Sequence, residues 1–533
     1  MRKLCLSSVL LLLLLISCRK NDNVINKAFI VTGLINSADS IIPADLVIPA
    51  DSVKLNPYGY APLSALVNFT SPVAGKTVII VKGKNGPPSD IEHVFADTGV
   101  LHSVPVIGLY ANYTNTVDIR LINNSGDTLA KTTINIQTGA LPANLPASIV
   151  ADVLPTAQVE KGMNLVSNFS EIGLPKSLIP LMVDNYGDIR WLLDYTSHPD
   201  LKNLLYDCGI KRLRNGNFYF GDVSTDKMYE VDLLGKILNT WDLSSKGYVF
   251  QHDIDEKPDG NFIITVSKNG STHPNGDATI EDYVVEMDRE TGNIKTEWDL
   301  KVSLDEYRTA LTDDLHDWFH TNSVLYDSTD NTIIVSGRQQ GVAKLTFDNR
   351  VKWILSAHKG WGTNERGEDL NQFLLTPLDA TGNRITDTAV LQGYTNHPDF
   401  EWSWYEHSTI ALPDGDYMVF DNGAVRNYNN DGLKYSRAVE YKIDPVNMTI
   451  QQKWQYGKER GLETYSAIVS KVQYLPGTNH VLFCPGYQVV NTNGQGGKIV
   501  EVDYATGKVV SQLSFSAANK WGFHRAERMS AYP

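Results

Sequence analysis

Three histidines occupy equivalent places in three repeats of this sequence: His252, His320 and His407. Each precedes a turn and a short apolar strand, and these segments read PDGNFIITV, DNTIIVSG and PDGDYMVF. Arg338 follows the second of these strands, at the end of the triplet SGR. Because equivalent positions of a closed repeat protein converge on one centre, we expect these four side chains to form a shared polar site.

Two kinds of chemistry fit three imidazoles and one guanidinium. Three neutral imidazoles and a water molecule can form an open zinc site, although Arg338 beside it argues against a dication. Alternatively, Arg338, His252 and His320 can donate hydrogen bonds to an oxyanion while His407 attacks it as a nucleophile. Sulfate and phosphate esters both fit the second arrangement. A nucleotide donor is not expected, because no Gly-rich phosphate loop precedes a helix.

Aromatic residues flank two of the histidines. Trp318 lies two residues before His320, and the segment WSWYEHSTIALPDGDYMVFDNG (402–423) contains His407 after an aromatic cluster. We expect Trp318, Trp404 and Tyr405 to bind an aromatic ring, and packing within a repeat is the alternative role. The remaining histidines of the repeats, which we interpret as solvent or loop residues, include His316, His358, His397 and His524.

A repeat beginning near residue 164 predicts the fold of the larger part of the chain. A turn and a short strand ending in tryptophan recur, and a degenerate sixth instance ends at Leu513. An alternation of turns and short strands with a periodic aromatic residue is typical of a β-propeller. We predict six blades, an insertion over about 357–404, and closure by residues 521–529, which would add a strand to the first blade. The tryptophans that end these strands are Trp191, Trp241, Trp298, Trp353 and Trp454.

The part before the repeats is predicted to be a separate domain. Residues 27–138 contain short strands separated by Gly, Pro and Asn turns, which favours a small β-sandwich. Residues 139–160 are rich in Pro and Ala and are predicted to link this domain to the propeller at 161–533. The expected fold class is therefore all-β: a six-bladed β-propeller preceded by a small N-terminal β-sandwich domain.

The N-terminal residues MRKLCLSSVLLLLLLISC predict export and lipid anchoring. Residues 1–17 have a charged start and an apolar stretch too short for a comfortable membrane span, and they end like a bacterial lipobox. We expect a lipid on Cys18, a tether at 18–26, and a location in the bacterial cell envelope, with membrane contact through the anchor only. A plain signal peptide is the alternative.

Charge and cysteine content argue against nucleic acid as a partner and against a cysteine-based metal site. The net charge is −14, and no Lys- or Arg-rich run is present, so nucleic acid is not an expected partner. After removal of the signal, only Cys208 and Cys484 accompany Cys18, too few for a cysteine-based metal site. Whether Cys208 and Cys484 pair is left open.

Several motifs together resemble the bacterial aryl-sulfate sulfotransferases of the arylsulfotransferase family. They are HSVPVIGLY (102–110), QHDID, FHTNS, SGR and EHS, spread over nearly all of the mature chain. The resemblance implies ping-pong transfer of a sulfuryl group from an aryl sulfate donor to a phenol acceptor, without the nucleotide donor PAPS, another cofactor or a metal. It further implies that His407 becomes sulfurylated, that His252, His320 and Arg338 hold the sulfuryl oxygens, and that the protein forms a homodimer.

Two features depart from the enterobacterial members of that family, which are soluble and carry a short-range disulfide. This chain has a lipobox and no closely spaced cysteine pair. Two other functions remain compatible with the same residues. One is a metal-dependent propeller hydrolase or lyase that uses the three histidines, and the other is a non-catalytic surface-binding lipoprotein.

Overall fold

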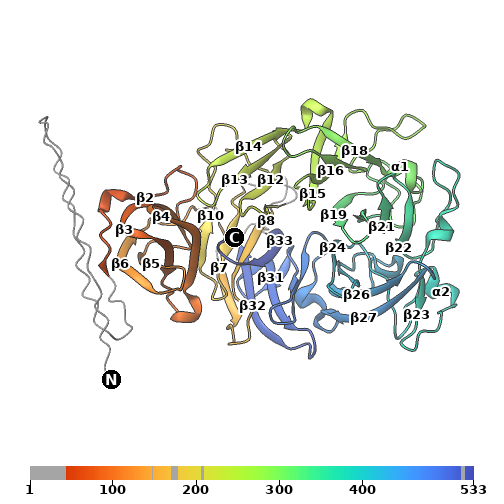
Figure 1. The fold of residues 1–533 in the computed structure, drawn as a ribbon. Helices are drawn as coiled ribbons and strands as arrows, with labels where there is room; N and C mark the ends of the chain where they lie inside the picture. The colour runs from red at the N-terminus through yellow and green to blue at the C-terminus, as the bar shows by residue number, and fades with distance from the viewer. Residues whose placement is uncertain (1–43, 144, 147, 170–177, 206–208, 518–521) are drawn as a thin grey trace, which may run out of the picture. The chain divides into compact units, whose positions relative to one another are not determined.

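The computed structural model describes residues 44–533 except 144, 147, 170–177, 206–208 and 518–521. The predicted signal peptide, Cys18, the tether and the first residues of the predicted sandwich domain lie outside these residues, as does Cys208. Within the described part, the α-helices are short, α1 (Leu300–Ser303) and α2 (Thr388–Leu391), and none has the length or apolar character needed to cross a membrane. The remaining elements are strands, turns and short 3-10 helices (Figure 1).

The N-terminal sheet is built around one long bent strand, β3 (Ser64–Val81). Its first half pairs with β2 and its second half with β5, while β4 follows it along most of its length. Residues 72–75, whose Pro and Gly have the composition of one of the predicted turns, are therefore an irregularity inside β3, where the register with β4 shifts between Thr70 and Gly75. The other strands of this sheet are β1 (Ala44–Asp45), β2 (Val53–Leu55), β4 (Ile91–Ile107), β5 (Thr114–Ile122) and β6 (Thr128–Gln137).

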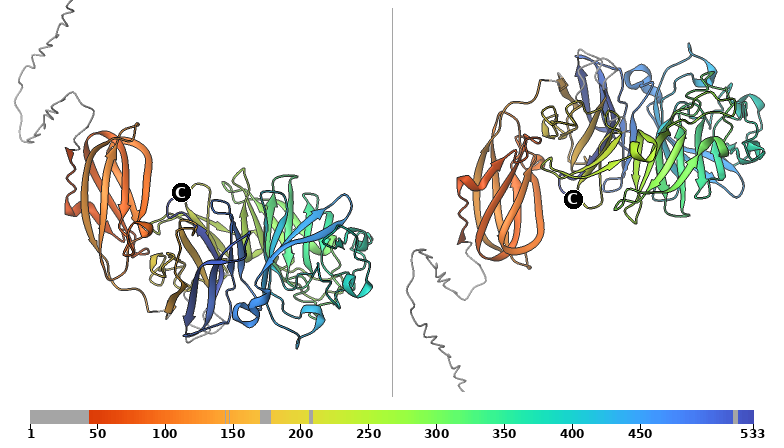
Figure 2. Two further views of the ribbon diagram at one scale, coloured as in Figure 1. Left: turned by 90° about the horizontal axis from the view of Figure 1, so that it is seen from below. Right: turned by 90° about the horizontal axis from the view of Figure 1, so that it is seen from above.

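The rest of the described chain forms six further sheets, matching the six repeats and the predicted β-propeller fold (Figures 1 and 2). Each sheet is an antiparallel meander of four strands, to which the fifth and sixth sheets add extra strands.

The strands of the first three sheets are β33 (Gly522–Met529), β8 (Met163–Phe169), β9 (Leu181–Val183) and β10 (Ile189–Leu192); β11 (Lys211–Arg212), β12 (Phe218–Asp222), β13 (Lys227–Val231) and β14 (Ile237–Asp242); and β15 (Tyr248–Glu256), β16 (Phe262–Lys268), β17 (Tyr283–Met287) and β18 (Ile294–Asp299).

The strands of the last three sheets are β19 (Thr321–Asp327), β20 (Thr332–Gly337), β21 (Gly341–Thr346) and β22 (Val351–Leu355); β24 (His407–Ala411), β25 (Tyr417–Asp421), β26 (Arg437–Asp444), β27 (Thr449–Tyr456) and β23 (Thr376–Leu378); and β28 (Lys471–Leu475), β29 (His480–Cys484), β31 (Gly494–Asp503), β32 (Val509–Ala517) and β7 (Ser148–Val153), with β30 (Val489–Asn491) paired to β31.

The C-terminal strand β33 closes the propeller, as the sequence predicts. It pairs with β8 of the first sheet from Gly522 to Met529, so the last strand of the chain completes the first sheet. In the sixth sheet, β7 is an edge strand and pairs with β32. Strand β7 lies inside the segment expected to be a linker, and the domain boundaries themselves stay predictions.

The repeated tryptophan has a specific structural role in four of the repeats. In each, the indole on the fourth strand of one sheet donates a hydrogen bond to a backbone carbonyl of the next sheet. An indole N–H buried between two sheets requires such an acceptor, so the repeat encodes the contact between neighbouring sheets. The pairs are Trp191 with Leu233 (2.8 Å), Trp241 with Arg289 (2.7 Å), Trp298 with Thr346 (2.8 Å) and Trp454 with Tyr504 (2.9 Å).

The histidines and the apolar strands that follow them lie on different strands of each sheet. The strands of the PDGNFIITV type are the second strands of their sheets, and the histidines lie on or beside the first strands. The insertion at 357–404 contributes to the core of the fifth sheet, where the buried indole of Trp402 donates to the Val390 carbonyl of α2 at 2.9 Å.

Arg528 in β33 joins the first and last sheets. Its guanidinium is 5% exposed and contacts Glu501 Oε2 at 2.9 Å and Asn164 Oδ1 at 2.9 Å. Removing one partner of a buried ion pair leaves the other charge uncompensated, which costs about 3–5 kcal/mol.

We therefore predict that Arg528→Ala lowers the free energy of unfolding by about 3–5 kcal/mol, measured by denaturant unfolding. The control is Arg350→Ala, which removes an exposed guanidinium paired with Asp348 and should cost less than about 1 kcal/mol. Equal effects of the two substitutions would contradict a closing role for Arg528.

Candidate active site

The three predicted histidines occupy the first strands of three sheets, which surround the propeller centre. His252 lies in β15, His320 immediately precedes β19, and His407 is the first residue of β24. In each sheet the register between the first and second strands shifts beside the histidine. Bulges of this kind redirect side chains and are common next to active sites.

Backbone conformation at the site is strained in several places. His320, Ser408 and Glu281 have φ angles of 57°, 56° and 56°, in the left-handed region that side chains with a Cβ rarely adopt. Such strain is stable only when the surrounding contacts fix it.

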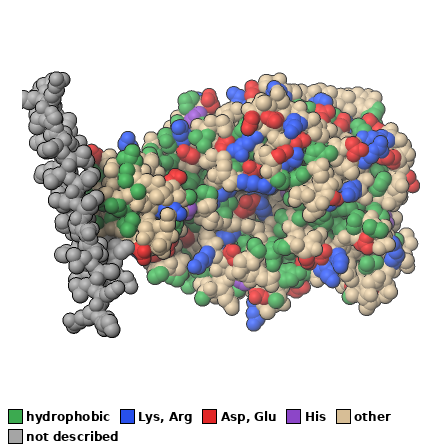
Figure 3. All heavy atoms as spheres, viewed as in Figure 1, with side chains coloured by type: hydrophobic (Ala, Val, Ile, Leu, Met, Phe, Trp, Pro, Cys, Tyr) green, Lys and Arg blue, Asp and Glu red, His purple; other side chains and the backbone are tan. Residues whose placement is uncertain are grey.

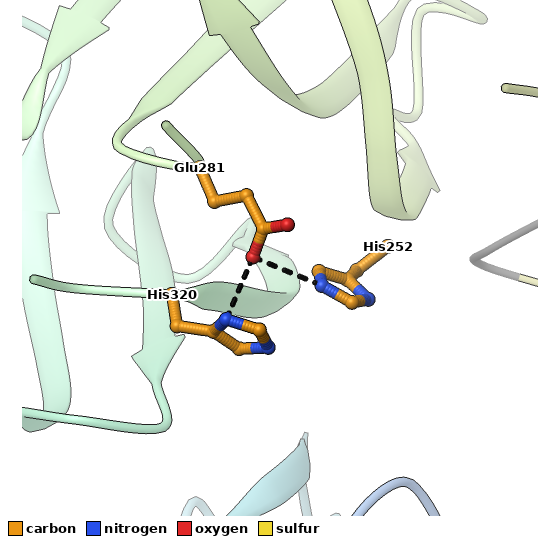
Figure 4. Close-up of side chains that lie close together, drawn as sticks. All are labelled: His252, Glu281 and His320. Atoms are coloured by element: carbon orange, nitrogen blue, oxygen red, sulfur yellow. Dashed lines mark hydrogen bonds and ion pairs between the residues drawn. The ribbon is translucent and has the colours of Figure 1, made fainter. Parts of the chain in front are cut away.

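Glu281 connects two of the histidines (Figure 4). Its Oε2 lies 3.1 Å from His252 Nε2 and 2.8 Å from His320 Nδ1. The two imidazole rings are 4.9 Å apart between centroids. Burial alone would raise the pKa of the Glu281 carboxyl, but the neighbouring charges of His252 and His320 hold that pKa well below its usual value. The carboxyl group is therefore ionised.

Arg338 is connected to His320 through a second carboxylate. Asp317 Oδ2 lies 2.7 Å from His320 Nδ1 and 3.6 Å from one terminal nitrogen of Arg338. The backbone N–H of Arg338 also donates to the His320 carbonyl at 3.1 Å. The guanidinium is 21% exposed, so part of its hydrogen-bonding capacity remains available at the surface of the site.

The hydrogen bonds of His407 define its tautomer. Asn422 uses its side-chain N–H groups to donate to the carbonyls of Ser466 (2.8 Å) and Val469 (3.0 Å), so its Oδ1 is an acceptor. That oxygen lies 2.8 Å from His407 Nδ1, which must carry the proton. The Val469 backbone N–H donates to Nε2 at 3.2 Å, consistent with a lone pair there. Nε2 is therefore the nucleophilic atom of His407.

The protonation of His407 follows from its environment. Burial lowers the pKa of His407 well below its usual value of 6.5, against the opposing effect of the hydrogen bond to Asn422. The charge of Arg338 lowers the pKa of His407 further, followed by the charges of His252 and His320. The four predicted residues thus lie close enough to interact electrostatically, and His407 is neutral at pH 6.5.

A fourth histidine belongs to the site, contrary to the loop interpretation made from the sequence. His524 in β33 is 2% exposed and stacks on His252, with ring centroids 5.7 Å apart. The register between β33 and β8 shifts between Phe523 and Arg525, as it does beside the other histidines. Burial, and then the charges of Arg525, His252 and His407, lower the pKa of His524 well below its usual value.

Several buried polar atoms around the site have no protein partner among the described residues. Such atoms are uncommon in folded proteins and are often satisfied by a ligand or water. They are Asp317 Oδ1, Asn322 Oδ1, Arg338 Nε and His524 Nε2.

The three aromatic residues expected to bind a ring have different environments. Trp318 and Trp404 are 0% and 2% exposed and pack in hydrophobic core clusters, so neither offers an open face in this conformation. Tyr405 is partly exposed, and the Arg338 guanidinium lies 5.7 Å from its ring centroid. Tyr405 is therefore the best placed of the three to contact a substrate at the site.

A cavity of about 320 Å³ lies along the first strands, on the residues that follow the four histidines. Its lining includes Asp253, Ser323, Ser408 and Arg525 and consists mainly of charged and polar side chains, so it does not suit a phenyl ring. Figure 3 shows basic and acidic side chains close together near the centre of the face viewed in Figure 1. A larger cavity of about 950 Å³ lies near Trp241 and Arg289 and contains none of the site residues.

A metal ion could be held by His252, Glu281 and His320, whose ligand atoms lie within 4.8 Å of one another. His407 is not part of this group, so a site of three histidines is not formed by the described residues. Without a metal, His252 and His320 both donate hydrogen bonds to the Glu281 carboxylate instead.

Three further residues of the site lie outside the repeat positions considered in the sequence. Glu281 and Asp317 lie in connecting segments, and Asn422 follows a second strand, at positions where the repeats differ. The FHTNS and EHS segments contain no signal for them. His524 could have been recognised by aligning the closing strand with the first strands of the other repeats.

We predict that His407 stays neutral at pH 6.5, with its proton on Nδ1, and gains a second proton only at a clearly lower pH. NMR of ¹⁵N-histidine-labelled protein measures both properties, and His407→Asn identifies the signal. Asn422→Ala should keep the proton on Nδ1, because the Tyr405 carbonyl also lies 3.0 Å from that atom, but it should lower the pKa of His407 further, because the hydrogen bond to Asn422 raises this pKa. Protonation of His407 near pH 6.5, or a neutral form with the proton on Nε2, would refute this assignment.

Comparison with known proteins supports the predicted family. Residues 154–524 match the family model described as arylsulfotransferase (ASST), and residues 52–139 match its Ig-like domain. The arylsulfate sulfotransferases AssT of Escherichia coli O6:H1 and of Lelliottia amnigena are 30% and 29% identical to this chain. Both alignments cover 87% of this chain and 89% of the relative.

A solved structure of a Bacteroides caccae protein has a TM-score of 0.40 and 13% identity, over 69% of this chain and 98% of that chain, which is too distant to support an argument. The family model and the two curated relatives, in contrast, extend over most of the sequence and include both its N-terminal domain and its propeller. The chain therefore belongs to the arylsulfotransferase family.

Proposed function

We propose that this protein transfers a sulfuryl group from a phenolic sulfate ester to a phenol, through a sulfohistidine on His407 and without a nucleotide donor. The observation that carries this proposal is the state of His407. Its Nδ1–H is held by Asn422, and its Nε2 carries a lone pair that is not protonated at pH 6.5. A neutral imidazole beside a guanidinium and two further imidazoles is suited to attack an anionic sulfate ester.

In the first half of the reaction, the lone pair of His407 Nε2 attacks sulfur. The bond between sulfur and the phenolic oxygen breaks, and the electron pair leaves with the phenolate, which takes up a proton. Arg338, His252 and His320 supply donors for the sulfuryl oxygens, whose charge they stabilise during transfer. The Val469 N–H must release Nε2 before this attack, and it can then donate to the transferred group.

In the second half, an acceptor phenol loses its proton and its oxygen attacks the same sulfur. The N–S bond breaks, and the electron pair returns to His407 Nε2, which restores the resting enzyme. Two half-reactions of this kind let donor and acceptor use one aromatic site in turn. Tyr405 beside Arg338 is the residue best placed to contact the ring of either phenol.

The proposed function predicts that purified protein moves sulfate from a chromogenic aryl sulfate to an added phenol, with parallel initial-rate plots and no need for PAPS. His407→Asn should reduce transfer to the uncatalysed rate, because asparagine cannot form the intermediate. A mass increase of one SO₃ group on wild-type protein, lost in acid, identifies the sulfurylated residue.

His397→Asn is the matched control for this experiment. His397 Nδ1 accepts from the Asp399 backbone N–H in an exposed turn, and an asparagine side chain can replace that contact. Its activity should equal that of the wild type. Hydrolysis of the donor regardless of acceptor would exclude the transferase, and loss of activity in chelator would favour a metal-dependent hydrolase or lyase at His252, Glu281 and His320.

We further propose that the mature protein is anchored to a membrane of the bacterial cell envelope through a lipid on Cys18. The lipobox that precedes this cysteine supports the proposal. A lipid chain binds the membrane through buried CH₂ groups, and combined chains anchor stably.

Cys18→Ser should abolish labelling by radioactive palmitate and move the protein from the membrane pellet to the soluble fraction. Cys5→Ser, within the predicted signal peptide, should leave both properties unchanged. Continued labelling of the Cys18→Ser protein would exclude this anchor.

A further inference from the structure

Glu281 occupies a fixed position at the junction of the third and fourth sheets. Its backbone N–H donates to Ser267 Oγ at 2.9 Å, and its carbonyl accepts from the Thr321 backbone N–H at 2.9 Å. The Thr321 hydroxyl donates to the same carbonyl at 2.6 Å. These contacts hold Glu281 in its left-handed conformation, with φ at 56°, between the strands that carry His252 and His320.

The side chain of Glu281 determines how both imidazoles are oriented. One oxygen, Oε2, accepts from His252 Nε2 and from His320 Nδ1. Figure 4 shows that the second nitrogen of each ring points away from the carboxylate. The carboxylate is 12% exposed and ionised, so it is an acceptor only.

The number of protons on each ring then determines whether its second nitrogen can donate a hydrogen bond to a sulfuryl oxygen. A neutral imidazole has one N–H, and a carboxylate at one nitrogen places the proton on that side. The opposite nitrogen would then present a lone pair, which repels a sulfuryl oxygen. Only an imidazolium can donate to Glu281 and to a sulfuryl oxygen at the same time. A carboxylate that contacts both rings stabilises this doubly protonated form.

We propose that Glu281 is a positioning residue of the sulfuryl-transfer site, which orients His252 and His320 and keeps both as cationic donors toward the sulfuryl oxygens. This inference rests on the proposed function. It assigns the two imidazoliums to charge stabilisation and leaves neutral His407 as the nucleophile, so that similar side chains act in opposite protonation states. Opposite protonation states require different surroundings for the rings. A carboxylate faces His252 and His320, whereas a neutral amide faces His407.

Other charged and titratable groups face the same pair and enter the pH dependence. Asp317 reinforces the effect of Glu281 on His320, whereas the charge of Arg338 opposes additional positive charge. His407 and His524, whose pKa values are lowered, also lie beside the pair. Beside His252, the carboxylate of Asp253 is paired with Lys211 and Arg525.

Binding of inorganic sulfate, measured by titration calorimetry, tests the inference without turnover. Glu281→Gln keeps the shape of the side chain but removes the negative charge that faces both rings. We expect sulfate to bind about tenfold more weakly than to the wild type near pH 8, with proton uptake on binding. In acid, where both rings are protonated regardless, the variant should bind sulfate at least as tightly, because a negative charge has been removed.

Two variants complete the calorimetric test. Glu281→Asp keeps the charge and should retain much of the affinity near pH 8. Glu290→Gln removes an exposed carboxylate of the same sheet and should bind as the wild type does. Tighter binding to Glu281→Gln at every pH would overturn the proposal and show that Glu281 merely competes with the oxyanion. Unchanged affinity at every pH would also overturn it.

Turnover gives an independent measurement. Glu281→Gln should lower kcat for aryl sulfate by about 10²–10³-fold and shift the alkaline limb of the pH–rate profile to lower pH, with a smaller change in KM. A structural role alone would leave that limb in place. If the wild-type protein transfers no sulfuryl group, the proposed function fails, and the sulfate titration still decides the role of Glu281.

Discussion

The carboxylate of Asp253 ties together the first strands of four sheets at the centre of the propeller. One of its oxygens lies 2.7 Å from Lys211 Nζ in β11 and 2.7 Å from Arg525 in β33, and the other accepts from the Val324 backbone N–H in β19. Burial would raise the pKa of Asp253, but Arg525 and Lys211 lower it below its usual value, so the group is ionised. Because Asp253 adjoins His252, the same buried charge that joins the sheets also fixes the position of a site residue.

The site depends on irregular backbone placed within a regular fold. The first strands carry bulges beside His252, His407 and His524, and left-handed residues adjoin or coincide with the site at His320 and Ser408. A regular strand would direct alternate side chains to opposite faces of its sheet, away from one another. The surrounding sheets, held together by the repeated indole hydrogen bonds, supply the rigid frame in which this strain persists.

Much of the fold can be predicted from the sequence because the same repeat unit recurs along the chain. A turn and a short strand ending in tryptophan recur in five units, and a degenerate sixth ends at Leu513, so six sheets and their closure follow from periodicity. Long-range pairing cannot be read this way. The 72–75 segment has the composition of a turn, but pairing of β3 with β4 and β5 on either side makes it part of one strand. The pairing of β7 with the sixth sheet could not be predicted either, because the segment around β7 is rich in Pro and Ala and has the composition of a linker.

The candidate site could likewise be predicted only in part from the sequence. His252, His320 and His407 are recognisable because they occupy equivalent repeat positions, and Arg338 because it follows the strand next to one of them. Their partners are not, since Glu281 and Asn422 lie where the repeats diverge and contact the histidines only after the sheets have packed. Burial likewise separates Trp318 and Trp404 from Tyr405, although all three are neighbours of site residues in the sequence. Aromatic type alone does not distinguish core packing from contact with a ligand.

The closing strand also determines when a newly synthesised chain can form the complete site. Strand β33 supplies His524 against His252 and Arg525 against Asp253, yet it follows the strands of all the other sheets in chain order. Synthesis proceeds from the N-terminus, so a nascent chain that ends before β33 holds most of the sheets but lacks one wall of the central site. A protein cleaved before β33 is in the same condition. The topology thus confines a complete site to molecules in which β33 has been made and has paired with β8.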